Sequence, residues 1–219
     1  MSWRGEKGGI EAAKLKHEVV MSPTTYSYID YMQGDVAIEP RVYATLRLNK
    51  AYQFNPVPAG VDAQYIKGGQ ANLWTEQVYN MRHAQYMTWP RAFATIESVW
   101  TPVEQKNWTN FANRVEKHFE RLDVRQIKYA PSVYEPSFTA RLDADGQLWV
   151  EMQTEIDNIK VHYTFDNSFP DQFYPAYTTA VKVPKDAVQL KVMSYRGDTP
   201  KGRMLTISVE DLKKRMGKK

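Results

Sequence analysis

The strongest constraint on the fold is a change of pattern near residue 137. Up to that point, apolar runs of strand length alternate with longer amphipathic segments, and a polar loop follows each strand. This order is typical of parallel βαβ units. From residue 138 onward the apolar runs are short and are separated by turn-forming stretches such as DADG at residues 143–146. That second pattern predicts antiparallel β-structure.

The chain is therefore predicted to hold an α/β domain at residues 1–137 and a small antiparallel β-domain at residues 138–219. Two prolines in YAPSVYEPS, at residues 129–137, indicate a stiff linker between them. In the first domain we expect a strand stub that carries Trp3, followed by strands at residues 17–22 and 65–74. Helices are expected at residues 10–16, 35–54 and 103–122. Residues 81–100 are expected to form one or two helices, with Pro90 near the first turn of the second.

Composition excludes several kinds of site. The 219 residues are 42% hydrophobic and 25% charged, as in ordinary globular proteins, and they suffice for two domains. Cysteine is absent, which excludes disulfides, thiolate metal sites and cysteine nucleophiles and leaves both a cytoplasmic and an exported location open. The four histidines lack the spacing of metal ligands, and no phosphate-binding glycine motif occurs. We expect neither a metal nor a cofactor.

Charge and hydropathy limit the possible partners. The formal charge is +4, and the dense basic run is the tail, with Lys213, Lys214, Arg215, Lys218 and Lys219. We interpret this run as a solvated end rather than a nucleic-acid-binding arm and expect no nucleic-acid partner. No apolar run approaches about 18 residues, and the first residues lack the apolar core of a signal peptide, so neither a membrane span nor a signal peptide is predicted.

The stretch GGQANLWTEQVY, at residues 68–79, carries the clearest chemical signal. If this run is a strand, Trp74 and Glu76 point to the same face, because side chains two apart do so. An aromatic ring beside a carboxylate suits a sugar, which offers an apolar C–H face and hydroxyl groups that a carboxylate can accept from. The alternative is a core tryptophan and a solvated glutamate.

A second pair of residues follows the strand at residues 17–22. Tyr28 and Asp30 are two apart, like Trp74 and Glu76, although they are equally compatible with a packed aromatic and a turn former. In parallel α/β folds, binding and catalytic residues gather at the carboxyl ends of the strands. Trp3, Tyr28, Asp30, Trp74 and Glu76 all fall at such ends, which favours one shared site.

Several motifs together resemble one known family. GGQANLWTE is followed by YMTWPRAFATIESVW and is preceded by SWRG and by YID after the VVMSP strand. This set, in this order over residues 1 to about 137, resembles the end of the barrel in family-20 glycoside hydrolases, the β-N-acetylhexosaminidases. Residues 138–219, with YTFDNSFP, look like the small module that follows the barrel in many bacterial members.

The resemblance implies a fold and a reaction. The fold would be α/β, the C-terminal portion of a (β/α)8 TIM barrel followed by a small antiparallel β-sandwich-like domain. The family removes terminal N-acetylhexosamine from carbohydrates with retention, and the acetamido group of the substrate acts as the nucleophile. By motif, Tyr28 would hold the acetamido oxygen, and Asp30 and Glu76 would bind the outer hydroxyl groups. Trp74 would pack against the sugar, and Trp3 would close the pocket wall.

The sequence also departs from the family pattern. A TIM barrel needs ~250 residues, and no neighbouring Asp-Glu pair, the acid–base pair of the family, follows any strand here. We therefore expect a fragment of a longer hydrolase that supplies part of the sugar pocket and is inactive by itself. An incomplete barrel leaves strand edges open to self-association. The rival interpretation is a non-catalytic carbohydrate-binding or structural protein.

Overall fold

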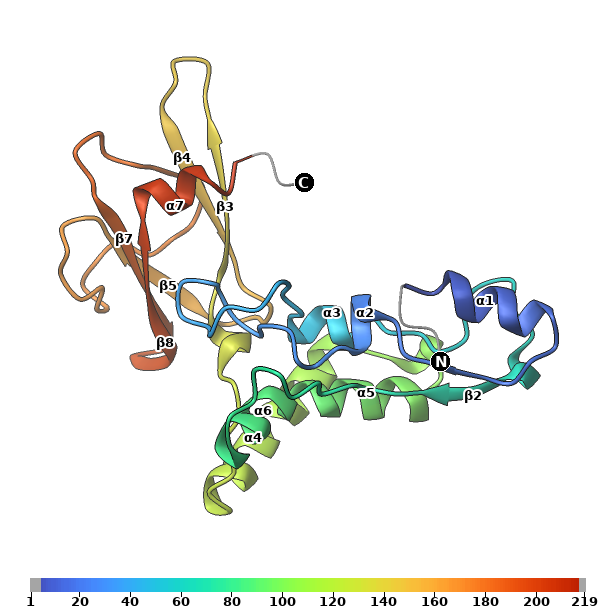
Figure 1. Cartoon of the computed structure of the whole chain (residues 1–219). Coiled ribbons are helices and arrows are strands. Elements are labelled where there is room, and N and C mark those ends of the chain that lie inside the picture. Colours follow the sequence, from blue (N-terminus) through green and yellow to red (C-terminus); the bar gives the residue numbers. More distant parts are fainter. Residues whose placement is uncertain (1–4, 217–219) are drawn as a thin grey trace. The chain divides into compact units, whose positions relative to one another are not determined.

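The computed structural model describes residues 5–216, so the predicted site residue Trp3 lies outside the described part. The chain forms two compact units (Figure 1). The first contains the residues up to Gln33 together with Pro40–Ala130. The second contains Gly34–Glu39 and the residues from Pro131 onward. The short segment 34–39 thus belongs to a different unit from the residues on either side of it.

The first unit is built on two short parallel strands and a set of helices (Figure 1). The strands are β1 (Val19–Met21) and β2 (Ile66–Gly69). The α-helices are α1 (Lys7–Lys14), α2 (Thr24–Ser27), α3 (Leu48–Tyr52), α4 (Met81–Thr88), α5 (Arg91–Trp100) and α6 (Trp108–Val124). Two 3-10 helices are η1 (Ala63–Tyr65) and η2 (Val103–Gln105). Parallel pairing through a helical connection was predicted from the order of the elements and is confirmed.

Side-chain caps set where two of these helices begin. The Asn80 side chain accepts a hydrogen bond from the backbone N–H of His83 (2.9 Å) at the start of α4. Asn107 accepts in the same way from Asn110 (2.8 Å) at the start of α6. The helix predicted for residues 103–122 was therefore placed too early. Of the one or two helices expected in residues 81–100, the structure has two, and α5 starts directly after Pro90.

Two other predicted elements are much shorter in the structure. The strand predicted for residues 65–74 ends at Gly69, so Trp74 and Glu76 lie in the loop after it. No side chain fits at Gly69, because a Cβ atom there would lie 2.4 Å from Cε1 of Phe54. The helix predicted for residues 35–54 is reduced to α3, since residues 34–39 form part of the second unit. Local propensity was overridden by tertiary contacts in that segment.

The second unit consists of two three-stranded antiparallel sheets. Their orders are β3-β4-β6 and β5-β7-β8. The strands are β3 (Ser137–Leu142), β4 (Leu148–Gln153), β5 (Lys160–Thr164), β6 (Val181–Lys182), β7 (Gln189–Arg196) and β8 (Thr199–Ser208). The 3-10 helix η3 (Ser132–Tyr134) precedes them, and α7 (Val209–Lys213) follows. The predicted antiparallel β-structure is confirmed.

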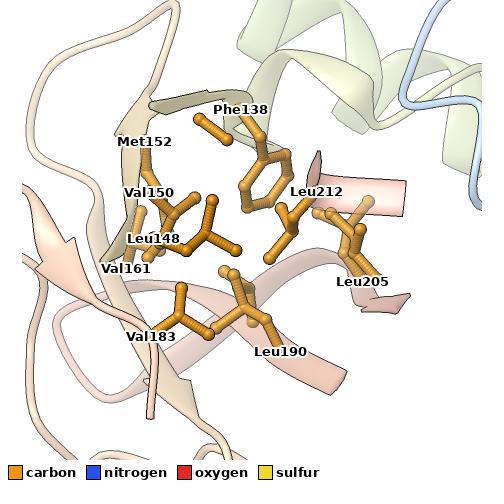
Figure 2. Close-up of a cluster of buried hydrophobic side chains, with 12 residues drawn as sticks. Phe138, Leu148, Val150, Met152, Val161, Val183, Leu190, Leu205 and Leu212 are labelled. Carbon is orange, nitrogen blue, oxygen red and sulfur yellow. The ribbon is translucent and has the colours of Figure 1, made fainter. Parts of the chain in front are cut away.

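One hydrophobic core joins both sheets of this unit (Figure 2). Phe138 and Val150 come from the β3-β4-β6 sheet, and Leu190 and Leu205 come from the other sheet. Leu212 of α7 packs into the same cluster and is 0% exposed. Along β3 and β4 buried and less buried residues alternate, which is the pattern of strands with one face toward a core.

Ion pairs hold segment 34–39 within the second unit. Arg203 of β8 donates to Glu135 (Nε–Oε1, 2.7 Å) and to Glu39 (Nη2–Oε1, 2.7 Å). Arg215 pairs with Asp35 (Nη2–Oδ1, 2.8 Å). The interpretation of the basic tail as a solvated end was therefore wrong for Arg215, whose side chain is only 17% exposed.

Candidate functional site

The two loops that carry the predicted site residues are joined by backbone hydrogen bonds beyond the strands. After β1 and β2 end, Gln70 N donates to Met21 O (2.9 Å) and Asn72 N donates to Ser27 O (2.8 Å). Ile29 N then donates to Asn72 O (2.9 Å), so that Tyr28 and Asn72 form an isolated parallel bridge. The parallel pair is thereby extended irregularly and brings the loop around Tyr28 beside the loop around Trp74.

Hydrogen bonds between buried polar side chains also join these two loops. The Asn72 side chain donates to Ser22 Oγ, and Ser22 Oγ donates to the carbonyl oxygen of Gln70 (3.1 Å). Ser22 is 0% exposed and Asn72 is 7% exposed. Buried polar groups of this kind are normally bonded to one another. Ser22 directly follows β1, whereas Asn72 lies three residues beyond the end of β2, and neither was predicted from the sequence.

A cavity of about 880 Å³ lies at this junction, within the first unit. Tyr28, Asp30, Trp74 and Glu76 all line it. The structure thus brings together four of the five residues predicted from sequence, and the fifth, Trp3, lies outside the described residues. Other lining residues are Arg41, Tyr43, His83 and Met87.

Aromatic rings form much of the cavity wall. The rings of Tyr28 and Trp74 lie 6.3 Å apart between centroids, and Tyr31 contacts both Tyr28 (5.7 Å) and Tyr43 (5.2 Å). Tyr28 is buried, whereas Trp74 is 44% exposed and Tyr43 is 77% exposed. The alternative interpretation required Trp74 to be a core residue. Trp74 is instead a partly exposed aromatic ring that lines the cavity.

Asp30 is a buried carboxyl group on the same cavity. Burial is the main cause that raises its pKa, and the negative charge of Glu76 acts in the same direction. A backbone hydrogen bond, the positive charge of Arg91 and a hydrogen bond from Tyr43 act against the rise. Among the described residues Oδ1 of Asp30 has no hydrogen-bond partner. This oxygen is buried, so Asp30 keeps one acceptor unused among the described residues.

Tyr31 and Tyr43 were missed by the sequence analysis. Burial, together with the neighbouring Tyr43 and Asp30, raises the pKa of Tyr31 to about 12, so its phenol stays a neutral donor. Tyr31 follows Asp30 in the run YSYIDY and could have been included on spacing alone. Tyr43 gave no local signal, because it lies in a segment predicted to be helical.

The chemistry of the cavity favours a neutral polyol with an apolar face. Trp74 and the tyrosines offer flat apolar surfaces, and Asp30 and Glu76 offer acceptor oxygens. His83 stacks on Tyr79 (5.9 Å between centroids). Within residues 5–216, no group of three or more histidine or acidic side chains could hold a metal ion. No helix in this described range is long and apolar enough to cross a bilayer.

Comparisons with known families bear on both units. The family model described as glycosyl hydrolase family 20, catalytic domain, matches residues 1–103. Residues 1–103 belong to glycosyl hydrolase family 20. The four predicted residues on the cavity all lie within this family-20 segment. A second family model, described as Fn3 associated, matches residues 150–209 in the second unit.

Two curated hexosaminidases are similar to this chain over different lengths. A β-hexosaminidase from Porphyromonas gingivalis is 34% identical over 210 residues, which are 93% of this chain and 26% of the relative. A β-N-acetylhexosaminidase from Cellulomonas fimi is 31% identical over 114 residues, which are 50% of this chain and 23% of the relative. The chain thus spans about a quarter of the length of the curated relatives it matches.

Solved structures of family-20 enzymes share the fold of part of the chain. The exo-β-N-acetylglucosaminidase from Vibrio harveyi, solved in complex with N-acetylglucosamine, has a TM-score of 0.54 at 34% identity, over 58% of this chain and 21% of that one. The β-N-acetylhexosaminidase from Streptomyces coelicolor has a TM-score of 0.52 at 20% identity, over 57% and 26% of the two chains, which shows the fold alone. The similarity covers a mixed α/β segment.

Proposed function

We propose that this chain supplies part of the sugar pocket of a β-N-acetylhexosaminidase, an enzyme that removes terminal N-acetylhexosamine from carbohydrates. One observation carries the proposal. Tyr28 and Asp30 come from one loop and Trp74 and Glu76 from another, and all four line a single cavity in a segment that belongs to family 20. Such a combination of flat aromatic surface and carboxylates is what a sugar ring requires.

The proposed architecture follows the same relatives. Residues 1–137 would form the last strands and helices of a TIM barrel, and residues 138–219 a β-sandwich-like module. The parallel pairing of β1 with β2, the position of the cavity after the strand ends, and the family-20 structural neighbours support the first assignment. The two antiparallel sheets around one core support the second.

Each of the four residues has a proposed role in substrate-assisted hydrolysis with retention. The acetamido oxygen of the substrate attacks its own anomeric carbon, and Tyr28 holds that oxygen close to the carbon it attacks. Asp30 and Glu76 accept hydrogen bonds from the outer hydroxyl groups of the sugar. Trp74 packs against the ring or the acetamido group.

The acid–base pair would come from another part of the enzyme. The leaving oxygen must receive a proton from a carboxylic acid within hydrogen-bond reach. Asp30 and Glu76 are assigned to the hydroxyl end of the sugar, and nowhere in the 219 residues is an aspartate followed directly by a glutamate. We therefore propose that the chain binds the sugar without cleaving it.

Titration of the chain with N-acetylglucosamine tests the binding step. We expect a dissociation constant of about millimolar or weaker, because only part of a pocket is present to offset the entropy of binding. Glucose, which lacks the acetamido group, should bind less tightly. Binding is followed by the changes in NMR chemical shift that the sugar causes. Trp74→Ala should abolish these changes. Trp100→Ala removes a tryptophan that does not line this cavity and should leave them intact. Equal responses to both sugars, or loss of binding in both variants, would contradict the proposed pocket.

A further inference from the structure

Arg91 is a fully buried arginine that binds the loop carrying Asp30. It is the first residue of α5 and is 0% exposed. Its guanidinium group donates hydrogen bonds to four backbone carbonyl groups from three segments of the first unit. These are the carbonyl groups of Ile29 (2.6 Å), Tyr31 (2.7 Å), Met87 (2.9 Å) and Leu46 (3.1 Å).

Two of these carbonyl groups belong to the residues on either side of Asp30. A guanidinium group is planar and presents its donors in fixed directions, so the peptide groups that it binds are fixed relative to one another. Ile29 is bound by Nη2 and Tyr31 by Nη1 of the same side chain. The main chain that carries the Asp30 carboxyl group is therefore held on both sides by one buried residue.

The charge of Arg91 acts on the same carboxyl group. Burial raises the pKa of Asp30 and the negative charge of Glu76 adds to the rise, whereas the positive charge of Arg91 lowers it. Tyr43 donates a hydrogen bond that also lowers it. The other titratable groups around this cavity are Arg41, which lines it, Tyr28 and Tyr31 on the Asp30 loop, and His83 on α4. Arg91 thus favours the ionised carboxylate, the form that accepts hydrogen bonds and donates none.

We propose that Arg91 is a positioning residue for sugar recognition: it holds Asp30 in place through the carbonyl groups of Ile29 and Tyr31, and its positive charge favours the carboxylate form that accepts sugar hydroxyl groups. The proposal rests on the proposed role of Asp30 as an acceptor for sugar hydroxyl groups. It separates two contributions, one geometric and one electrostatic. Arg91→Lys removes the geometric contribution and keeps the charge, whereas Arg91→Gln removes both.

Gln33 offers a matched control on the same loop. Its side chain is 1% exposed and donates to the carbonyl groups of Tyr86 and Trp89, the latter at 3.3 Å. Like Arg91, it is a buried side chain that anchors the segment after Asp30 to the region of α4 and α5. Unlike Arg91, it carries no charge. Gln33→Leu therefore loosens this segment without changing the electrostatics at Asp30.

The test uses the 219-residue chain labelled with ¹³C at the aspartate carboxyl groups. The Asp30 signal is identified by its absence in Asp30→Asn. Its titration is followed by NMR without any sugar in the wild type, Arg91→Gln, Arg91→Lys and Gln33→Leu. The affinity for N-acetylglucosamine at neutral pH is then measured for the same proteins.

We expect Asp30 to titrate at a higher pH in Arg91→Gln than in the wild type. In Arg91→Lys and Gln33→Leu it should titrate as in the wild type, because the charge near Asp30 is retained. Both Arg91 variants should bind N-acetylglucosamine about fivefold more weakly or worse, since neither replacement can donate to all four carbonyl groups.

An unchanged Asp30 titration in Arg91→Gln would overturn the proposal. So would an unchanged sugar affinity in Arg91→Lys, and this second result decides the matter if the glutamine variant does not fold. Failure of the wild-type chain to bind the sugar would instead count against the proposed function. In that case the sugar-free titration still shows whether Arg91 acts on Asp30.

Discussion

Asp30, which we propose binds the sugar, illustrates how such a residue can weaken the fold that carries it. The carboxyl group is 7% exposed and has an unpartnered oxygen among the described residues. Burial raises its pKa above the ordinary value of 3.8. A carboxyl group with a raised pKa favours the folded state below the pKa of the unfolded chain, and this contribution is lost as the pH rises through the folded-state pKa. Wherever the pH lies above that pKa, the ionised Asp30 therefore opposes folding.

The first prediction follows from this pH dependence of the contribution of Asp30 to stability. Asp30→Asn should be more stable than the wild type at neutral pH, because a neutral amide replaces a buried charge. The difference should shrink as the pH falls through the pKa of Asp30, where the wild-type carboxyl group is also neutral. Urea unfolding at a series of pH values measures it, with Asp186→Asn, an exposed site, as the control. A wild type that is more stable than Asp30→Asn at neutral pH would contradict the account of Asp30.

The second prediction separates the proposed roles of Tyr28 and Glu76 in a complete enzyme that contains this chain. Tyr28→Phe should lower kcat more than it raises KM, because the hydroxyl group positions a nucleophile and acts mainly in the transition state, a contact worth roughly 2–4 kcal/mol. Glu76→Gln should raise KM as well, since it binds hydroxyl groups already present in the ground state. Tyr79→Phe, which changes an exposed tyrosine, is the control. Small and equal effects at both sites would remove the assignment.

At the level of single residues, the sequence indicated four side chains that line the cavity but not the buried arginine that binds the loop of Asp30. Tyr28, Asp30, Trp74 and Glu76 could be found because they follow apolar strand runs at a spacing of two. Arg91 could not be recognised, since its role depends on carbonyl groups that are 45 and 62 residues away in the chain. No local pattern encodes such a contact.

Among the structural elements, segment 34–39 is held in the second unit by the cluster of Arg203, Glu39 and Glu135. The side chains of Glu39 and Glu135 are 1% and 0% exposed, and both accept hydrogen bonds from Arg203. Their separations from Arg203 are 164 and 68 residues. This is why a helix was wrongly predicted across residues 35–54: the reason for the irregular segment lies on a strand far along the chain.

The third prediction concerns this cluster. Arg203→Met should destabilise the second unit by about 3–5 kcal/mol, because it leaves two buried carboxylates without their shared partner. Arg141→Met is the matched control. It breaks an exposed pair with Glu151 and should change stability by about 1 kcal/mol or less. Urea unfolding followed by the near-ultraviolet signal of Trp149, the tryptophan of β4, gives the comparison. A loss for Arg203→Met no larger than for Arg141→Met would show that the cluster contributes little.

At the scale of the whole molecule, the change of pattern near residue 137 corresponds to a division between Ala130 and Pro131. The connection is not a free linker, because Ser132, Val133, Tyr134 and Glu135 are buried. Lys201 and Arg196 lie over the ring of Tyr134. The sequence could show two patterns of apolar residues, one typical of parallel α/β structure and a second typical of antiparallel β-structure. It could not show that residues 34–39 join the second unit, since that depends on ion pairs between distant residues.

We propose that this chain holds a sugar-binding cavity without the acid that cleaves the sugar. Hydrolysis of a nitrophenyl N-acetylglucosaminide by the purified 219-residue chain is the decisive measurement. We expect no release of nitrophenol above background, because no carboxylic acid in the chain is assigned to the leaving oxygen. Turnover that persists through purification and is abolished by Glu76→Ala would contradict it, and would make Glu76 the acid.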